Sequence, residues 1–173
     1  MLDREACERR VYRLAVLLTG DLQAATRVIE QVIGAQPDLR QLDGAHMDRL
    51  TVLRSREIPR RAINHTRAPH AVAEALADLP AQQRETWVFA RVYQMQQREL
   101  SKCMDCSVSA AHMHLQAADE TMARWLGFEA NTAAKSMLDF SLSLDVPAIY
   151  RSTQQRRRIL RNPGFDLDDH SAA

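Results

Sequence analysis

The chain has 173 residues, of which 46% are hydrophobic and 26% are charged, and these proportions exclude wholesale disorder and collagen-like or disulfide-dense proteins. Aromatic residues make up only 5%, so leucine, alanine, valine, isoleucine and methionine must supply the core. The net charge of +1 excludes a strong overall attraction to nucleic acid, so local charge must decide whether the chain binds DNA.

Strand-forming residues are sparse, and five glycines with six prolines leave few places for hairpin turns, so the sequence predicts an all-α fold. No segment approaches the roughly 20 apolar residues of a membrane span, and the first residues lack the apolar run of a secretory signal. Three cysteines, an odd number, argue against a disulfide framework. We therefore expect a cytoplasmic protein with no membrane partner.

Helical spacing of apolar residues predicts three helices in the first third of the chain. Residues 3–19 carry one such pattern. Asp21 is placed to cap a second helix that ends at Gly34. A third pattern begins at Met47 and runs into Pro59, whose missing N–H would break a helix. These helices predict a small bundle.

After this bundle the helical patterns stop at a segment that has two prolines and few large apolar residues, which is typical of a linker. The predicted division is a helical domain at residues 1–58, a linker at 59–70, a second helical domain at 71–126 and a helical C-terminal extension at 127–173. In the extension, Thr132–Leu144 has helical spacing and should pack on the second domain or on an oligomeric partner. The extension ends in an acidic tail that we expect to be disordered.

The second domain contains the pattern of a helix-turn-helix. A helix from Gln96 to Met104 is followed by a break at Asp105, and a long helix begins at the capping residue Ser107 and ends at Leu126. The positions expected to face inward are Leu100, Cys103, Met104, Cys106, Ala111, Leu115 and Ala118. Those expected to face outward from the second helix are Ser109, His112, His114 and Gln116.

The order of motifs along the chain resembles region 4 of the extracytoplasmic-function sigma factors of bacterial RNA polymerase. These motifs are Leu79-Pro80, then Arg84-Glu85 after three residues, then Arg98-Glu99-Leu100 and Ser107 before the long helix. Upstream, Tyr12-Arg13-Leu14, Leu18-Thr19-Gly20-Asp21 and Val28-Ile29-Glu30-Gln31-Val32-Ile33 are similar to the opening of region 2. Together these stretches cover residues 10 to about 126, roughly two thirds of the chain.

The resemblance implies a transcription protein that binds the RNA polymerase core through region 2 and promoter DNA through region 4. The implied polymerase contacts are Arg27, Glu30 and Gln31. The expected DNA contacts are Ser107, Ser109, His112, His114 and Gln116 on the second helix. A basic cluster, which would bind phosphates, consists of Arg54, Arg56, Arg60 and Arg61.

The chain departs from the family at several positions, as a divergent or degenerate member would. His112, His114 and Ala117 replace cations usual in the recognition helix, and histidine carries little positive charge near pH 7. Arg27 replaces an acidic polymerase contact, and the promoter-melting Trp and Asn are absent from residues 47–61. The alternative is a sigma mimic that binds an anti-sigma factor or another regulator through protein contacts alone.

Other residue patterns have simpler interpretations. Cys103, Cys106, His112 and His114 are suited in type to zinc, but the two histidines lie about 200 degrees apart around a helix, so we expect core cysteines and no metal. Motifs for catalysis are absent, which predicts no enzyme, no cofactor and no small-molecule substrate.

The tryptophans and the second basic cluster complete the predictions. Trp87 and Trp125 lie at helical positions and are expected to anchor the core. A further cluster comprises Arg151, Arg156, Arg157, Arg158 and Arg161. It either binds phosphate or an acidic protein, or pairs with Asp166, Asp168 and Asp169 in the tail.

Overall fold

A computed structural model describes residues 3–34, 43–148 and 150, and these ranges contain helices and no strand, which confirms the all-α prediction. The helices are α1 (Arg4–Thr19), α2 (Leu22–Val32), α3 (Gly44–Arg56), α4 (His70–Asp78), α5 (Ala81–Trp87), α6 (Gln97–Met104), α7 (Val108–Leu126) and α8 (Ala130–Leu142). A π-helix, η2 (Val88–Val92), continues α5, and a 3-10 turn, η3 (Gly127–Glu129), joins α7 to α8. No helix in these ranges has the length and apolar character to cross a bilayer.

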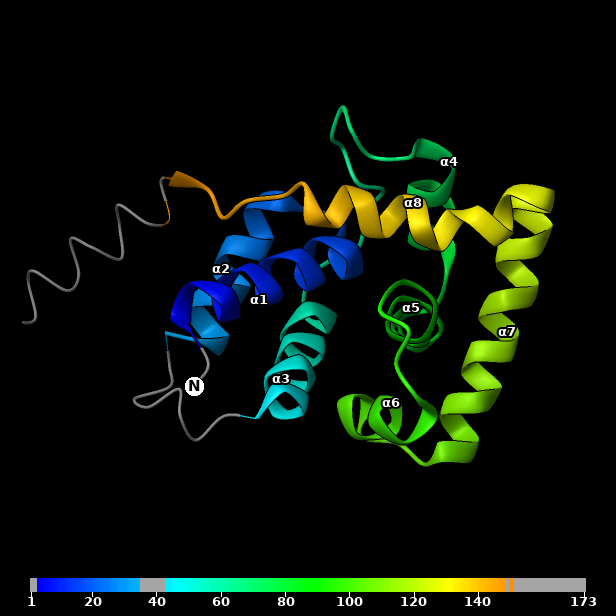
Figure 1. The fold of residues 1–173 in the computed structure, drawn as a ribbon, viewed down its shortest axis with the longest axis horizontal. Helices are drawn as coiled ribbons and strands as arrows, with labels where there is room; N and C mark the ends of the chain where they lie inside the picture. Colours follow the sequence, from blue (N-terminus) through cyan, green and yellow to red (C-terminus); the bar gives the residue numbers. More distant parts are fainter. Residues whose placement is uncertain (1–2, 35–42, 149, 151–173) are drawn as a thin grey trace, which may run out of the picture.

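The first three helices begin and end where local side chains favour it. Asp3 caps α1, and Asp21 caps α2 by accepting hydrogen bonds from two backbone amides at 3.0 Å. Between them, Gly20 ends α1 in the left-handed conformation. The helix α1 then packs against both α2 and α3 (Figure 1).

The remaining helices pack around α5 and η2. The hairpin of α6 and α7 covers α5, and α7 stands on the side of α5 away from α3 (Figure 1). From the end of α7, α8 runs back across η2 to α1. The helix predicted at Thr132–Leu144 is therefore present as α8, and it packs on α7 and η2 as well as on α1.

Buried apolar side chains of both predicted domains belong to one continuous core. The predicted linker lies against this core, because Ile63 is buried and the Arg61 amide donates to the Thr19 carbonyl at 2.9 Å. The ring of His65 lies 5.4 Å from that of Phe140 on α8. The division at residues 59–70 remains a prediction, but the two halves are in extensive contact.

The two tryptophans differ in burial. Trp87 is buried in the core as predicted, whereas Trp125 is 55% exposed, so the prediction that both anchor the core is wrong for Trp125. Met122 and Leu126 occupy the inward face at the end of α7. Trp125 precedes Leu126 and lies about 100 degrees away around the helix. The second basic cluster and the acidic tail lie outside the described residues.

Candidate nucleic-acid interface

The turn between α6 and α7 has the local geometry of a helix-turn-helix. Asp105 ends α6 in the left-handed conformation, and the Cys106 amide donates to the Ser101 carbonyl at 3.1 Å. Ser107 then begins α7, because its hydroxyl accepts a hydrogen bond from the Ala110 amide at 3.0 Å. The predicted break and the predicted capping residue are therefore both present.

The inward face of the helix-turn-helix agrees with the sequence prediction. Six of the seven predicted residues are buried, namely Leu100, Cys103, Met104, Ala111, Leu115 and Ala118, and Cys106 is half-buried. Burial raises the pKa of the Cys103 thiol to about 11, so this cysteine stays protonated at neutral pH. No group of three metal-ligating side chains occurs within the part of the chain that the structure describes.

Four exposed residues form a stripe along the opposite side of α7, which we call the α7 outer face. They are Ser109, His112, Met113 and Gln116, and they follow the i, i+3, i+4, i+7 spacing of one helix side. Met113 is 69% exposed, the largest apolar exposure on this stripe. The sequence prediction omitted Met113, although its spacing from Ser109 and Gln116 was the signal that places it there.

His114 does not belong to the α7 outer face. It is half-buried and lines a hollow with Pro80 and Gln83 at the start of α5. His112 instead lies near α6, with its Nδ1 atom 3.3 Å from the Gln97 amide nitrogen. The structure thus brings Ser109, His112 and Gln116 together and separates His114 from them.

All four arginines of the first basic cluster interact with the rest of the protein. Arg54 pairs with Glu57 at 3.4 Å, and Arg61 pairs with Asp21 at 3.2 Å. The Arg60 guanidinium donates to the Leu79 carbonyl. Arg56 makes two hydrogen bonds, of 2.8 and 2.7 Å, with the buried Glu85 carboxylate. These contacts reduce the charge that the cluster offers to phosphate.

Arg84, from the motif that carries the sigma resemblance, is buried among the carbonyl oxygens of two helix ends. Its guanidinium donates to the carbonyls of Leu76 and Leu79, both at 2.8 Å, and to that of Leu18. Leu76 lies in the last turn of α4 and Leu18 in the last turn of α1, where carbonyls lack helical partners and carry partial negative charge. Arg84 therefore caps both helices at once.

The charge of this cap persists at neutral pH. Burial, with the nearby positive charge of Arg60, lowers the pKa of Arg84 to about 10. The guanidinium therefore remains protonated under physiological conditions. Together with the Arg56 and Glu85 pair, it makes the Arg-Glu dipeptide of the motif a brace between the first and second halves of the chain.

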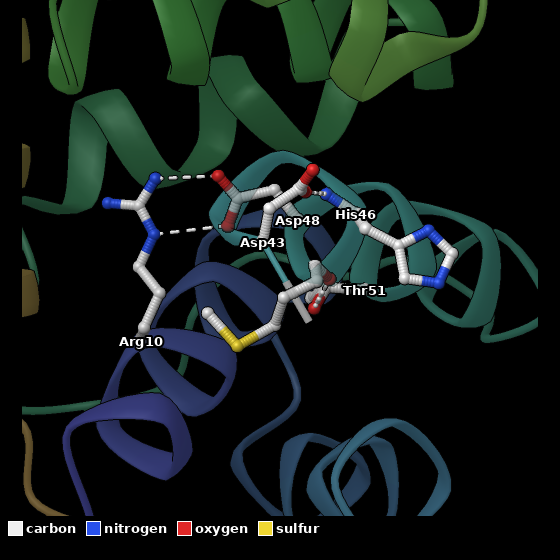
Figure 2. Close-up of polar contacts among 6 residues, drawn as sticks. Arg10, Asp43, His46, Asp48 and Thr51 are labelled. Carbon is white, nitrogen blue, oxygen red and sulfur yellow. Dashed lines mark hydrogen bonds and ion pairs between the residues drawn. The ribbon is translucent and has the colours of Figure 1, made fainter. Parts of the chain in front are cut away.

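A second set of contacts joins α1 and α3 to the segment after η2. Arg10 makes two hydrogen bonds with Asp48, of 3.1 and 2.9 Å, and Figure 2 shows the two groups facing each other. The same guanidinium lies 4.2 Å from the centre of the Tyr93 ring. Nearby, Arg49 on α3 pairs with Asp105 in the turn before α7 at 2.7 Å. These contacts hold the helix-turn-helix against α3.

Tyr93 should make the stability of the protein depend on alkaline pH. Its hydroxyl is buried without a hydrogen-bond partner, and burial raises the pKa of Tyr93 to about 12. The folded state then keeps a proton that the unfolded chain loses above about pH 10. The contribution of Tyr93 to the free energy of unfolding is therefore complete below that pH and is lost as the pH rises towards 12.

We expect Tyr93→Phe to change the free energy of unfolding little at neutral pH, since the lost hydroxyl has no partner. Urea denaturation near pH 8 and near pH 11 should show a smaller alkaline loss for the variant than for the wild type. Arg84 has a pKa shifted in the opposite direction, but both proteins share it, so their difference isolates Tyr93. An equal loss of stability between pH 8 and pH 11 in the variant and the wild type would contradict the assignment of this pH dependence to Tyr93.

The predicted polymerase contacts lie on α2. Arg27 and Gln31 are exposed and one helical turn apart, so they share a side of the helix, and Glu30 is half-buried. The opposite side of α2 is buried against α1 and α3. Arg27 and Gln31 are therefore accessible to a partner.

Sequence reasoning identified Arg84, Glu85 and Asp105 only as motif or turn residues, and the structure gives each a specific partner. Arg84 lies between Gln83 and Glu85, so no local sequence pattern signals that it is buried or names its partners. Comparisons of the chain with protein-family models, with curated proteins and with solved structures find no match.

Proposed function

We propose that the protein is a sigma-factor-like transcription protein, which binds the RNA polymerase core through α2 and promoter DNA through the helix-turn-helix. The observation that carries this proposal is the α7 outer face. It is a continuous exposed stripe, polar except for Met113, presented by a helix whose other side is fixed in the core. Hydroxyl and amide groups are among the side chains that read base edges in a major groove, and an imidazole can also donate or accept a hydrogen bond.

The beginning of α7 supports contact with the DNA backbone. Amide groups in the first turn of a helix lack carbonyl partners and favour an anion such as phosphate. Ser107 satisfies only one of these groups, the Ala110 amide. Ser107 and Ser109 are both exposed at this end, so a phosphate has access to it.

The basic cluster divides into two functional pairs. The guanidinium groups of Arg54 and Arg61 are exposed, with Arg54 paired to the exposed Glu57 and Arg61 to the half-buried Asp21. Surface ion pairs contribute only about 0 to 1 kcal/mol each, so a phosphate can replace these carboxylate partners. Arg56 instead holds the buried Glu85, whose carboxylate would lose this partner if Arg56 were released, and Arg60 donates to the Leu79 carbonyl, which also accepts from Arg84. We therefore assign phosphate contacts to Arg54 and Arg61 alone.

The salt dependence of duplex binding tests this assignment. Affinity for a labelled pool of random duplexes should fall as salt rises from about 50 to 200 mM, because counterions are released from the DNA. Replacing both Arg54 and Arg61 by glutamine should reduce the slope of log affinity against log salt by about 2. Arg124→Gln, on the exposed end of α7, is the matched control and should leave the slope unchanged. Absence of duplex binding at the lowest salt would contradict the DNA-binding part of the proposal.

Met113 favours the second candidate function, a sigma mimic that binds an anti-sigma factor or another regulatory protein. A large apolar side chain at the centre of the α7 outer face suits a protein partner, and Val108 adds a second exposed apolar group at the helix start. Met113→Arg separates the two functions, since an added cation should strengthen duplex binding but disrupt an apolar protein contact. Weaker duplex binding by this variant would count against DNA contact at this face.

A further inference from the structure

A cavity of about 680 Å³ lies between η2, the C-terminal half of α7 and α8. Its size falls within the range of small-molecule sites in proteins. Trp87, Val92, Met122 and Leu138 contribute apolar surface to its lining. The α7 outer face ends at Gln116, before the α7 residues that line this cavity, so the cavity is separate from the candidate nucleic-acid interface.

The polar groups of this cavity are mostly hydrogen-bond donors. Lys135, Asn131 and Gln94 line it, and none of their side chains has a hydrogen-bond or ion-pair partner among the described residues. Lys135 offers three N–H donors and no acceptor, and each amide offers two donors beside its one carbonyl oxygen, so N–H donors outnumber acceptor oxygens. A ligand that accepts hydrogen bonds is therefore the chemical match.

The charge of the cavity favours a single negative charge on that ligand. Its lining has one carboxylate, Asp119, which accepts hydrogen bonds from Arg91 at 3.1 and 2.6 Å. These bonds use Nε and Nη2 of Arg91, so the Nη1 donors remain for a ligand. With Lys135, the three charges sum to +1. A monoanion neutralises this charge, whereas a dianion such as phosphate would exceed it.

The backbone at this cavity is unusual in two ways. The segment Val88–Val92 is a π-helix, a turn that is rare and often found at functional sites. Gln94, two residues later, has a positive φ of 54°, a conformation that costs a non-glycine residue about 1 kcal/mol or more. Arg91 and Gln94, two of the donors, are both held by this distorted segment.

We propose that this cavity binds a small organic monocarboxylate with an apolar body. The carboxylate contacts the donors of Lys135, Asn131 and Arg91, and the body lies against Met122 and Leu138. Such a ligand would join α7 to α8. It is a bound ligand rather than a substrate, and the inference does not depend on the proposed function.

Calorimetric titration of the full chain with phenylacetate and with octanoate tests the proposal. At least one of the two should bind, and its neutral amide should bind at least about tenfold more weakly, because the amide lacks the charge that Lys135 and Arg91 recognise. Lys135→Gln should weaken carboxylate binding by a similar factor. Lys102→Gln, at an exposed position on α6, is the matched control and should leave binding unchanged.

The lysine content of the chain provides a second readout. Lys102 and Lys135 are its only two lysines, so acylation with an amine-reactive ester, followed by mass spectrometry, reports on each separately. The bound carboxylate should slow acylation of Lys135 and leave Lys102 unaffected. The proposal is overturned if neither carboxylate binds at about 10 mM, if carboxylate and amide bind equally, or if Lys135→Gln binds like the wild type.

Discussion

Replacing Gly20 with alanine is expected to lower the free energy of unfolding by about 3 kcal/mol or more. Gly20 has a φ of 73°, which disfavours any residue with a Cβ atom. An added Cβ would also lie 1.8 Å from the carbonyl oxygen of Arg61. The Arg61 backbone is held by the hydrogen bond that its N–H donates to the Thr19 carbonyl, so the backbone must move and the contact between the α1 end and residues 59–70 is lost.

Two other glycines serve as matched controls for this prediction. Gly127 has a φ of 57° and a ψ of −126° but open space around it, so Gly127→Ala should cost only backbone strain, about 1 to 3 kcal/mol. Gly44, in the first turn of α3, has neither a positive φ nor a close neighbour, and Gly44→Ala should stabilise the protein by about 0.5 kcal/mol. Urea denaturation of the three variants separates the backbone strain of a positive φ from the steric overlap of an added Cβ with a neighbouring carbonyl. A loss at Gly20 no larger than that at Gly127 would contradict the packing of the predicted linker.

Replacing Arg84 with methionine should lower the free energy of unfolding by about 3 kcal/mol, since the carbonyls of Leu18, Leu76 and Leu79 lose the charged donor that they share, although Leu76 and Leu79 each keep a second donor. Methionine fills similar space, so the loss reports the missing hydrogen bonds rather than a cavity. Arg84→Lys should recover only part of the stability, because an ammonium group lacks the planar fork of a guanidinium.

Arg124→Met is the control for this prediction. Arg124 is exposed and donates only to the Thr121 hydroxyl, so its replacement should change the free energy of unfolding by no more than about 0.5 kcal/mol. Thermal and urea denaturation of both variants provide the measurement. A small effect at Arg84, equal to that of the control, would show that α1 and α4 do not depend on this shared cap.

The periodicity of the sequence predicts most of the helices and the inward face of the helix-turn-helix. Apolar residues that recur at helical spacing, such as Ala111, Leu115 and Ala118, are buried because only one side of α7 meets the core. Short polar residues at helix starts, such as Asp21 and Ser107, predict their own caps because the hydrogen bonds are local.

The sequence does not predict contacts between residues far apart in the chain. The partner of Arg56 lies 29 residues away at Glu85, and that of Arg10 lies 38 residues away at Asp48. No local pattern selects these partners from 22 acidic residues, so the first basic cluster seemed available for phosphate. The same limit applies to residues 59–70, whose prolines favour a linker while the packing of Ile63 depends on distant helices.

The abundance of arginine is explained in part by these long-range contacts. The chain has 21 arginines and two lysines. Arg10 and Arg56 each hold a carboxylate through two parallel hydrogen bonds, and Arg84 bonds three carbonyls. Arg13 similarly donates to the Leu142 and Leu144 carbonyls at the end of α8. Each role uses the several fixed donors of a guanidinium, which lysine lacks.

Capture of RNA polymerase by the tagged full chain tests the central proposal most directly. Polymerase core subunits should be recovered with the wild type, and Arg27→Ala combined with Gln31→Ala should reduce the recovery at least about tenfold by removing the exposed side chains of α2. Glu74→Gln, at an exposed position on α4, is the control and should recover as much as the wild type. Recovery of no polymerase subunit by a folded wild-type protein would contradict the sigma-factor-like function.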